Sequence, residues 1–343
     1  MSTFSNRHEG SVCDSSEAFV SINRQDAKSA KQHWEPVSAL FVISHGIDSF
    51  LACPWRLGSC IQFEQSNSLP MANVVTRPRV AASSYLNTAP LIWAFQKGSA
   101  RDAVELVTDA APARCGDLLA RGKVEAALVP IIEYQRIPEV RIVPDVCVGS
   151  HSAVRSVVLV SKYDELSKIR TVALDESSRT SQALVKIIFR EFVGVEPEWQ
   201  SSGPAAPAML EHNEAALVIG DPAMNISLPG VHVFDLATLW HRFTNTGFVF
   251  AMWMTDVRHV RAVSKVNFAA ARDEGLQNLE RIVANYTDEL PLPVAELRKY
   301  LTENITFHLD EMLEQGMRLY FQLALKHGLI DENKPLKFTN PPA

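Results

Sequence analysis

The fold of this chain is constrained most by an alternation of short apolar runs with amphipathic segments, which begins at residue 79. The apolar runs have the length and composition of strands, and several of the segments between them have the spacing of helices. Such alternation predicts an α/β fold with mainly parallel sheets, whose sites lie at the carboxyl ends of strands. The predicted strands are residues 79–82, 104–107, 126–129, 140–146, 157–160, 171–174, 216–219, 231–234 and 249–253, and the helices are 113–121, 180–192 and 236–242.

Beyond residue 253 the pattern becomes helical almost to the end of the chain. The predicted helices are residues 257–274, 276–285, 294–304 and 310–327. The last of them carries apolar side chains three and four residues apart, which indicates one face turned to the core. These side chains are Leu313, Met317, Tyr320, Phe321 and Ala324. We therefore expect a helical C-terminal region that serves as scaffold.

Residues 1–70 lack both periodicities and are rich in Ser, Asn and Gln. We expect a poorly ordered N-terminal extension over residues 1–75. Met71 precedes the first convincing strand and is a second plausible start, so residues 1–70 are interpreted as a dispensable tail or as a result of start-site choice.

Composition and charge exclude several classes of protein. A hydrophobic content of 47% and a charged content of 21% are typical of a globular chain. The net charge of −6 supplies no basic field, so neither nucleic acid nor a membrane surface is an expected partner. No apolar run reaches the about 20 residues of a membrane-spanning helix, and no secretory signal is recognised, which predicts a cytoplasmic protein. Phosphate-loop, dinucleotide and zinc motifs are absent, so no metal or organic cofactor is predicted.

The strongest local signal for a site is the segment from Asp175 to Ser181, between a predicted strand and a predicted helix. Hydroxyl groups, an arginine and free backbone N–H groups gather there at a helix N-terminus, which favours an anion such as a carboxylate. The candidate ligands are Ser178, Arg179, Thr180 and Ser181. The alternative is that Ser177 or Ser178 only caps the helix.

Three further polar positions follow or precede predicted strands. Ser84, Tyr85 and Asn87 come after the first strand, where ligands bind in open α/β folds, although Ser84 or Asn87 could equally cap a helix. Ser156 is a polar residue at the entry to an apolar strand. Asp221 follows another strand and is interpreted as a possible helix cap.

These segments together resemble one family. The sequence reads SYLN at 84–87, ALVPIIEYQ at 127–135, VRSVVLVS at 154–161, ALDESSRTS at 173–181, IGDPAM at 219–224 and FVFAMW at 248–253. In this order they resemble the chorismate dehydratases of the futalosine route to menaquinone, over residues 79–330. The family commonly has TGLPFVFA where this chain has TNTGFVFA at 244–251, so the Leu-Pro pair is missing.

The resemblance implies a two-lobed fold like the type II periplasmic binding proteins, with a helical C-terminal region. Lobe one would comprise residues 76–160 and 246–343, and lobe two residues 161–245. The two crossovers between the lobes would lie near residues 157–162 and 246–253, with the ligand in the cleft between the lobes.

The resemblance also implies the activity: a hydro-lyase that removes water from chorismate to give 3-[(1-carboxyvinyl)oxy]benzoate without a cofactor. By position, Asn87 would orient or polarise the reacting ring, and Ser156 would bond the departing hydroxyl. Ser84 and Tyr85 would contact the substrate, and residues 178–181 would hold a carboxylate, with Arg179 alternatively bracing the lobe. The competing hypotheses are the dihydroxynaphthoate synthase of the same pathway and a non-catalytic protein that binds or senses a small carboxylate. No oligomeric state is predicted.

Overall fold

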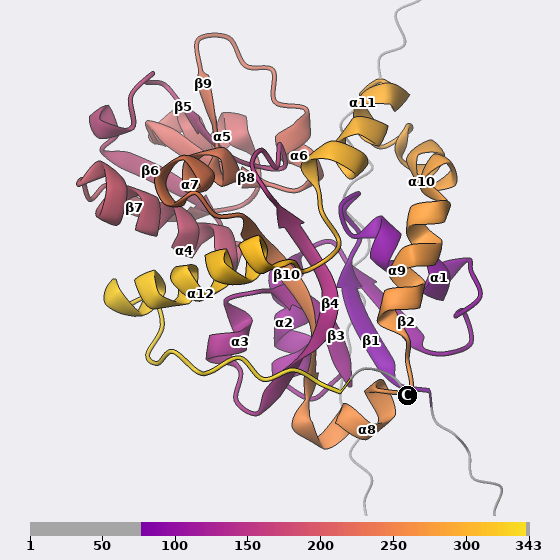
Figure 1. The fold of residues 1–343 in the computed structure, drawn as a ribbon. Coiled ribbons are helices and arrows are strands. Elements are labelled where there is room, and N and C mark those ends of the chain that lie inside the picture. Colours follow the sequence, from indigo (N-terminus) through magenta and orange to yellow (C-terminus); the bar gives the residue numbers. More distant parts are fainter. Residues whose placement is uncertain (1–76, 341–343) are drawn as a thin grey trace, which may run out of the picture. The chain divides into compact units, whose positions relative to one another are not determined.

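The structure is a computed structural model that describes residues 77–340, so the predicted extension over residues 1–75 lies outside the described residues. Ten strands form two five-stranded sheets (Figure 1). The first sheet has the order β2-β1-β3-β10-β4. Its strands are β1 (Arg79–Ser83), β2 (Glu105–Asp109), β3 (Ala126–Pro130), β4 (Val140–Ser150) and β10 (Phe248–Asp256).

The second sheet is built from the middle of the described chain and has the order β7-β6-β8-β5-β9. Its strands are β5 (Val157–Ser161), β6 (Thr171–Asp175), β7 (Glu198–Ser202), β8 (Ala215–Ile219) and β9 (His232–Asp235). Strands β3, β5 and β8 are buried along their whole length, because helices or loops cover both faces of the sheets. This burial explains why these strands stand out in the sequence as continuous apolar runs.

The prediction of mainly parallel sheets is wrong, because both sheets are mixed. Strand β1 is parallel to β2 and β3, and β6 is parallel to β7 and β8. Strand β10, however, is antiparallel to both β3 and β4, and β5 is antiparallel to both β8 and β9. Strands β5 and β10 are each the first strand that the chain forms after crossing from the other sheet, and each runs in the opposite direction to both of its neighbours.

The chain crosses between the sheets twice, as expected, but earlier than predicted on each occasion. Residues 151–156 join β4 to β5, and residues 245–247 lead into β10. The lobe boundary implied by the resemblance places residues 157–160 in lobe one, whereas the whole of β5 pairs with β8 and β9 in the second sheet. Apolar composition marks this segment as a strand but carries no information about which sheet it joins.

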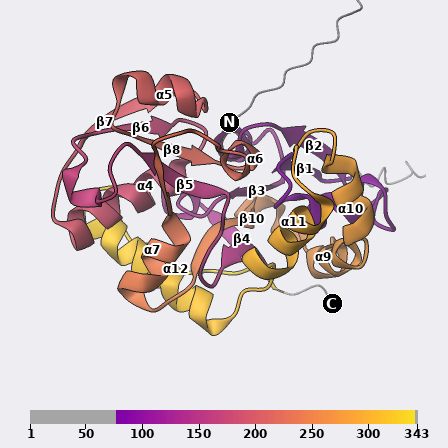
Figure 2. The same ribbon diagram turned by 90° about the horizontal axis from the view of Figure 1, so that it is seen from above.

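Short helices follow the strands of both sheets. Those after strands of the first sheet are α1 (Ala89–Gln96), α2 (Pro112–Ala120) and α3 (Glu133–Arg136). Those of the second sheet are η1 (Leu166–Lys168), α4 (Arg179–Ile187), η2 (Ile188–Val193), α5 (Ala206–His212), α6 (Asp221–Met224) and α7 (Leu236–Thr244). In Figure 2, α4, α5 and α7 gather around the second sheet, and α9, α10 and α11 lie beside the first.

The C-terminal region is helical as predicted, with one break that the sequence pattern missed. Its helices are η3 (Val257–His259), α8 (Val260–Val263), α9 (Phe268–Gln277), α10 (Leu279–Tyr286), α11 (Val294–Lys299), η4 (Tyr300–Asn304) and α12 (Glu311–Lys326). The predicted helix over residues 257–274 is interrupted before α9, where the side chain of Asn267 caps the new helix by accepting the N–H of Ala270 at 2.9 Å.

Helix α12 fixes the second crossover. Its five-residue apolar stripe is buried, as predicted, and the helix packs against β10 and α4. A Cβ added at Gly316 would lie 1.9 Å from the carbonyl oxygen of Gly247, so the helix touches the crossover backbone directly. Trp240 of α7 donates from Nε1 to the same carbonyl at 3.1 Å. These contacts hold the segment in which the Leu-Pro pair is missing.

Replacing Gly316 by Ala is expected to lower the free energy of unfolding by about 1 to 3 kcal/mol, because the added methyl group must push α12 away from the crossover. Gly203→Ala is the matched control, since a Cβ there meets nothing within 4 Å. Urea unfolding of both variants measures the effect. Equal stabilities of the two variants would contradict the proposed close packing.

Candidate functional site

The turns that follow β1, β6 and β8 meet at one cavity between the two sheets. The cavity has a volume of about 60 Å³. It contains side chains from both sheets and from the N-terminal turn of α4, as expected for strand ends that face each other. Its lining comprises Ser83, Tyr85, Asn87, Thr88, Pro112, Leu128, Pro130, Val148, Val157, Ser178, Thr180, Ser181, Ile219, Gly220, Phe250 and Ala251.

The N-terminal turn of α4 supplies the hydroxyl groups on one side of the cavity. Ser178 is the N-cap residue, but its side chain makes no capping hydrogen bond. The hydroxyl of Ser177 donates instead to Asp175 Oδ1 at 2.6 Å. Thr180 Oγ1 accepts the backbone N–H of Ile132, from the first-sheet side, at 3.2 Å. The capping alternative for Ser177 and Ser178 is therefore wrong, and Ser178, Thr180 and Ser181 line the cavity.

The turn after β1 supplies the opposite side. Tyr85 and Asn87 line the cavity, whereas Ser84 is exposed and does not. The amide oxygen of Asn87 accepts a hydrogen bond from the hydroxyl of Thr88 at 3.3 Å, and Thr88 Oγ1 is 2.9 Å from Ser83 Oγ. Neither Ser84 nor Asn87 caps helix α1, whose N-cap residue is Thr88, and the side chain of Thr88 makes no capping hydrogen bond.

Residues of the second sheet hold this turn in place. Both carboxylate oxygens of Asp221 accept the backbone N–H of Leu86, at 3.0 and 3.2 Å. Gly220 has a φ of 66° and lies so close to the ring of Tyr85 that an added Cβ would be 2.6 Å from it. Asp221 therefore joins the two sides of the cavity. The possibility that it caps a helix is not realised, because its carboxylate bonds to Leu86.

Arg179 is directed away from the cavity. Its guanidinium donates to Asp117 Oδ1 at 2.8 Å and to Glu133 Oε1 at 3.3 Å, both from the first-sheet side. It therefore braces the two halves of the structure, which was the alternative considered for it. No Lys, Arg, Asp or Glu side chain is among the lining residues of the cavity. An anion there would meet hydroxyls, an amide and backbone dipoles.

Ser156 lies immediately behind the lining, next to Val157. It is fully buried, and its hydroxyl accepts a hydrogen bond from the hydroxyl of Tyr300 at 2.7 Å. Tyr300 is also fully buried and begins the π-helical turn η4. No local feature of the sequence indicates this contact, because a single tyrosine in a predicted helix is ordinarily part of the core.

Two carboxyl groups lie beside the cavity: Asp175 is fully buried and Asp221 is partly buried. Burial raises the pKa of Asp221 from its ordinary 3.8 to about 6, against a smaller lowering by the N–H of Leu86. Burial likewise raises the pKa of Asp175, whose Oδ2 has no hydrogen-bond partner among the described residues. Both groups follow strands whose apolar pattern was recognised, but their burial depends on packing across the cavity.

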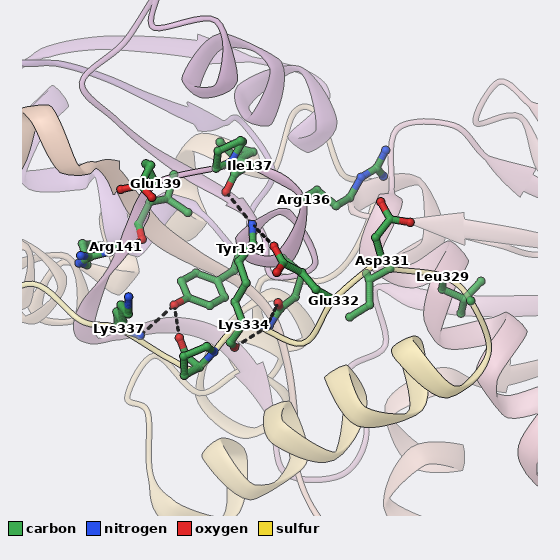
Figure 3. Close-up of a pocket in the computed structure, with 16 residues that line it drawn as sticks. Tyr134, Arg136, Ile137, Glu139, Arg141, Leu329, Asp331, Glu332, Lys334 and Lys337 are labelled. Carbon is green, nitrogen blue, oxygen red and sulfur yellow. Dashed lines mark hydrogen bonds and ion pairs between the residues drawn. The ribbon is translucent and has the colours of Figure 1, made fainter.

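A larger cavity of about 920 Å³ lies elsewhere, between α3, the start of β4 and residues 328–337 (Figure 3). Figure 3 shows Tyr134 reaching toward the backbone of Lys337, whose N–H donates to the tyrosine hydroxyl at 2.9 Å. Side chains of both charges line this cavity, namely Arg136, Glu139, Arg141, Asp331, Glu332, Lys334 and Lys337. None of the predicted site residues lies there, so we take the smaller cavity as the candidate site.

Residues 77–340 contain neither a metal-binding cluster nor a membrane-spanning helix. No group of three or more His, Cys, Asp or Glu side chains in this part of the chain is placed to hold a metal ion. Over the same residues, no helix combines the length and the apolar composition required to cross a membrane.

Comparisons with known proteins agree with this geometry. A family model described as menaquinone biosynthesis matches residues 78–326. A chorismate dehydratase from Thermus thermophilus is 29% identical over 255 residues, which cover 69% of this chain and 91% of that protein. A solved protein from Archaeoglobus fulgidus has a TM-score of 0.60 at 16% identity, with 76% of this chain and 100% of that one covered. The periplasmic aliphatic sulphonate-binding protein of Escherichia coli has a TM-score of 0.51 at 16% identity, with 77% and 96% covered.

Two mixed sheets joined by two crossovers, with a cavity between them, define the periplasmic-binding-protein-like class, and the solved structures share this fold. The expected fold class is therefore confirmed. The family match extends from the start of β1 to the end of α12 and so includes both sheets. This chain belongs to the menaquinone biosynthesis family.

The partly buried carboxyl of Asp221 leads to a pH-dependent prediction. Because its pKa is raised, the folded protein keeps this proton to higher pH than the unfolded chain does. Ionisation of Asp221 therefore lowers the free energy of unfolding progressively as the pH rises from about 4 to above 6. Asp221→Asn removes the ionisation and keeps an oxygen for Leu86. We expect its unfolding free energy, relative to the wild type, to increase by about 1 kcal/mol between pH 5 and pH 7.

Urea unfolding of both proteins at pH 5, 6 and 7 measures this difference. Comparing the variant with the wild type at each pH removes the contribution of the other titrating groups. A difference that stays constant across these pH values would show that the charge on Asp221 is not penalised by burial.

Proposed function

We propose that this protein is a chorismate dehydratase, a hydro-lyase that converts chorismate to 3-[(1-carboxyvinyl)oxy]benzoate. The observation that carries the proposal is the cavity itself. On a chain of the menaquinone biosynthesis family, Asn87 faces the hydroxyl-bearing first turn of α4 across a cavity with no charged lining. The similarity to the Thermus enzyme supports the same reaction. The cytoplasmic location stays a prediction.

The first turn of α4 is the proposed carboxylate site. Helix N-termini present unpaired N–H groups and the positive end of the helix dipole. Here the hydroxyls of Ser178, Thr180 and Ser181 surround that end, and all three residues are at least nine-tenths buried. Hydrogen bonds to a carboxylate in such a place are stronger than those between neutral groups. Arg179 contributes indirectly, because its ion pairs hold the start of α4 against the first sheet.

The reaction makes modest demands on the protein. The ring of chorismate loses a C–H proton and a hydroxyl group, becomes aromatic and releases one water molecule. Aromatisation supplies the driving force, so positioning and modest acid–base help suffice. Asn87 orients or polarises the ring, since an amide is not a strong base, and the substrate's own carboxylate takes the proton. Ser156 donates a hydrogen bond to the departing hydroxyl.

The size of the cavity implies that it must widen to admit chorismate. A volume of about 60 Å³ is far below the roughly 300 Å³ at which ligand pockets begin. We propose that the two sheets with their helices are the two lobes, and that they separate at residues 151–156 and 245–247. The contacts of Asp221 with Leu86 and of Arg179 with Asp117 and Glu133 then close the site over the substrate.

Asn87→Ala is expected to lower kcat for chorismate by about 10²- to 10³-fold, because one positioned polar contact to the reacting ring is lost. Asn285→Ala, the same substitution at an exposed position of α10, should leave kcat unchanged. The full chain is incubated with chorismate, and the product is followed by ultraviolet absorbance and by the loss of one water in mass spectrometry.

The same assay separates the competing functions. Chorismate that binds but is not consumed by the wild type would favour a binding or sensing protein. Absence of binding would favour the later dihydroxynaphthoate step with its larger substrate. Wild-type activity that survives unchanged in Asn87→Ala would remove Asn87 from the mechanism while leaving the reaction in place.

A further inference from the structure

Helix α11 and the turn η4 make three hydrogen bonds with residues 153–156 of the first crossover, and one of them reaches Ser156. Arg155 donates to Glu296 of α11 at 2.9 Å, and Asn304 of η4 donates to the carbonyl oxygen of Ala153 at 3.0 Å. Between them, the hydroxyl of Tyr300 donates to Ser156 Oγ at 2.7 Å. The first two contacts hold the crossover backbone. Only the third reaches a side chain proposed to act on the substrate.

The crossover is held in a strained conformation at this point. Arg155 has a φ of 62°, in the left-handed region that side chains other than glycine rarely adopt. Backbone N–H groups of Val154 and Arg155 both donate to Asp235 Oδ2, at 3.0 and 2.6 Å. A strained backbone conformation of this kind persists only where the surrounding contacts hold it in place, and such conformations are common at functional sites. Here it fixes the backbone that carries Ser156.

The direction of the hydrogen bonds defines what Ser156 is free to do. Since Ser156 Oγ accepts the proton of Tyr300, its own proton is directed elsewhere. Burial raises the pKa of Tyr300, and the hydrogen bond with Ser156 opposes this rise. The two hydroxyls therefore form a hydrogen-bonded pair with one sense, in which Tyr300 donates to Ser156 and Ser156 keeps its own proton to donate.

We propose that Tyr300 is a positioning residue that holds the hydroxyl of Ser156 by donating to it and leaves the proton of Ser156 free for the departing hydroxyl of the substrate. This inference rests on the proposed dehydratase function. Tyr300 does not line the cavity and acts only through Ser156. Tyr300 is also the first residue of a π-helical turn, which agrees with this role because such turns are frequent at functional sites.

The test is a double-mutant cycle in the full chain with chorismate as substrate. Tyr300→Phe should lower kcat by about 10- to 100-fold with KM changed by less than about twofold, since a positioning contact matters for the reaction and not for substrate binding. The double variant with Ser156→Ala should be no slower than Ser156→Ala alone. Tyr134→Phe is the matched control, because it removes a tyrosine hydroxyl that bonds to Pro335, outside the site.

An unchanged kcat in Tyr300→Phe, or effects of the two substitutions that multiply, would overturn the role of Tyr300 while the dehydratase function stands. A wild type that does not consume chorismate would overturn the dehydratase function and this role with it. If Tyr300→Phe does not fold, 3-fluorotyrosine at position 300 replaces it. This more acidic phenol should raise kcat at an unchanged melting temperature, whereas an unchanged kcat would mean that the tyrosine is only structural.

Discussion

The whole structure depends on the insertion of one strand between two others in each sheet, directly after the chain has crossed from the other sheet. Strand β10 separates β3 from β4, and β5 separates β8 from β9. Neither sheet is continuous without a strand that the chain supplies directly after leaving the other sheet. The two crossovers are short and are held by helices, with α12 against one and η4 against the other. The same contacts therefore fix the positions of the residues that line the cavity between the sheets.

The candidate site uses dipoles and hydroxyls where a charged side chain might be expected. Arginine is present at the start of α4, but Asp117 and Glu133 neutralise it and turn it into a brace. The buried Asp175 and the partly buried Asp221 accept hydrogen bonds from backbone N–H groups and, at Asp175, from a serine hydroxyl. An uncharged lining suits a doubly anionic substrate that must enter, lose water and leave, because it binds carboxylates without forming long-lived ion pairs.

Local pattern predicted the parts of the fold that local burial determines. Strands β3 and β8 were found because they are apolar throughout, whereas β7 was missed because Glu198–Ser202 is a polar edge strand. The predicted strand directions were wrong, because the periodicity of a strand does not show which strand will lie beside it or in which direction that strand runs. In the site, Tyr85, Asn87 and Thr180 were found as polar residues after buried strands. The contact of Tyr300 was missed, and the bracing role of Arg179 was foreseen only as an alternative and without its partners, since both depend on residues far away in the sequence.

The small volume of the cavity has a consequence for the time course of binding. If the chain rests in the closed arrangement, a ligand enters only during the fraction of time for which Asp221 has released Leu86 and the lobes have parted. The observed association rate then stops rising at high ligand concentration and levels off at the opening rate. The weak links across the cavity would in this way set the upper limit of turnover, independently of how fast the ring itself reacts.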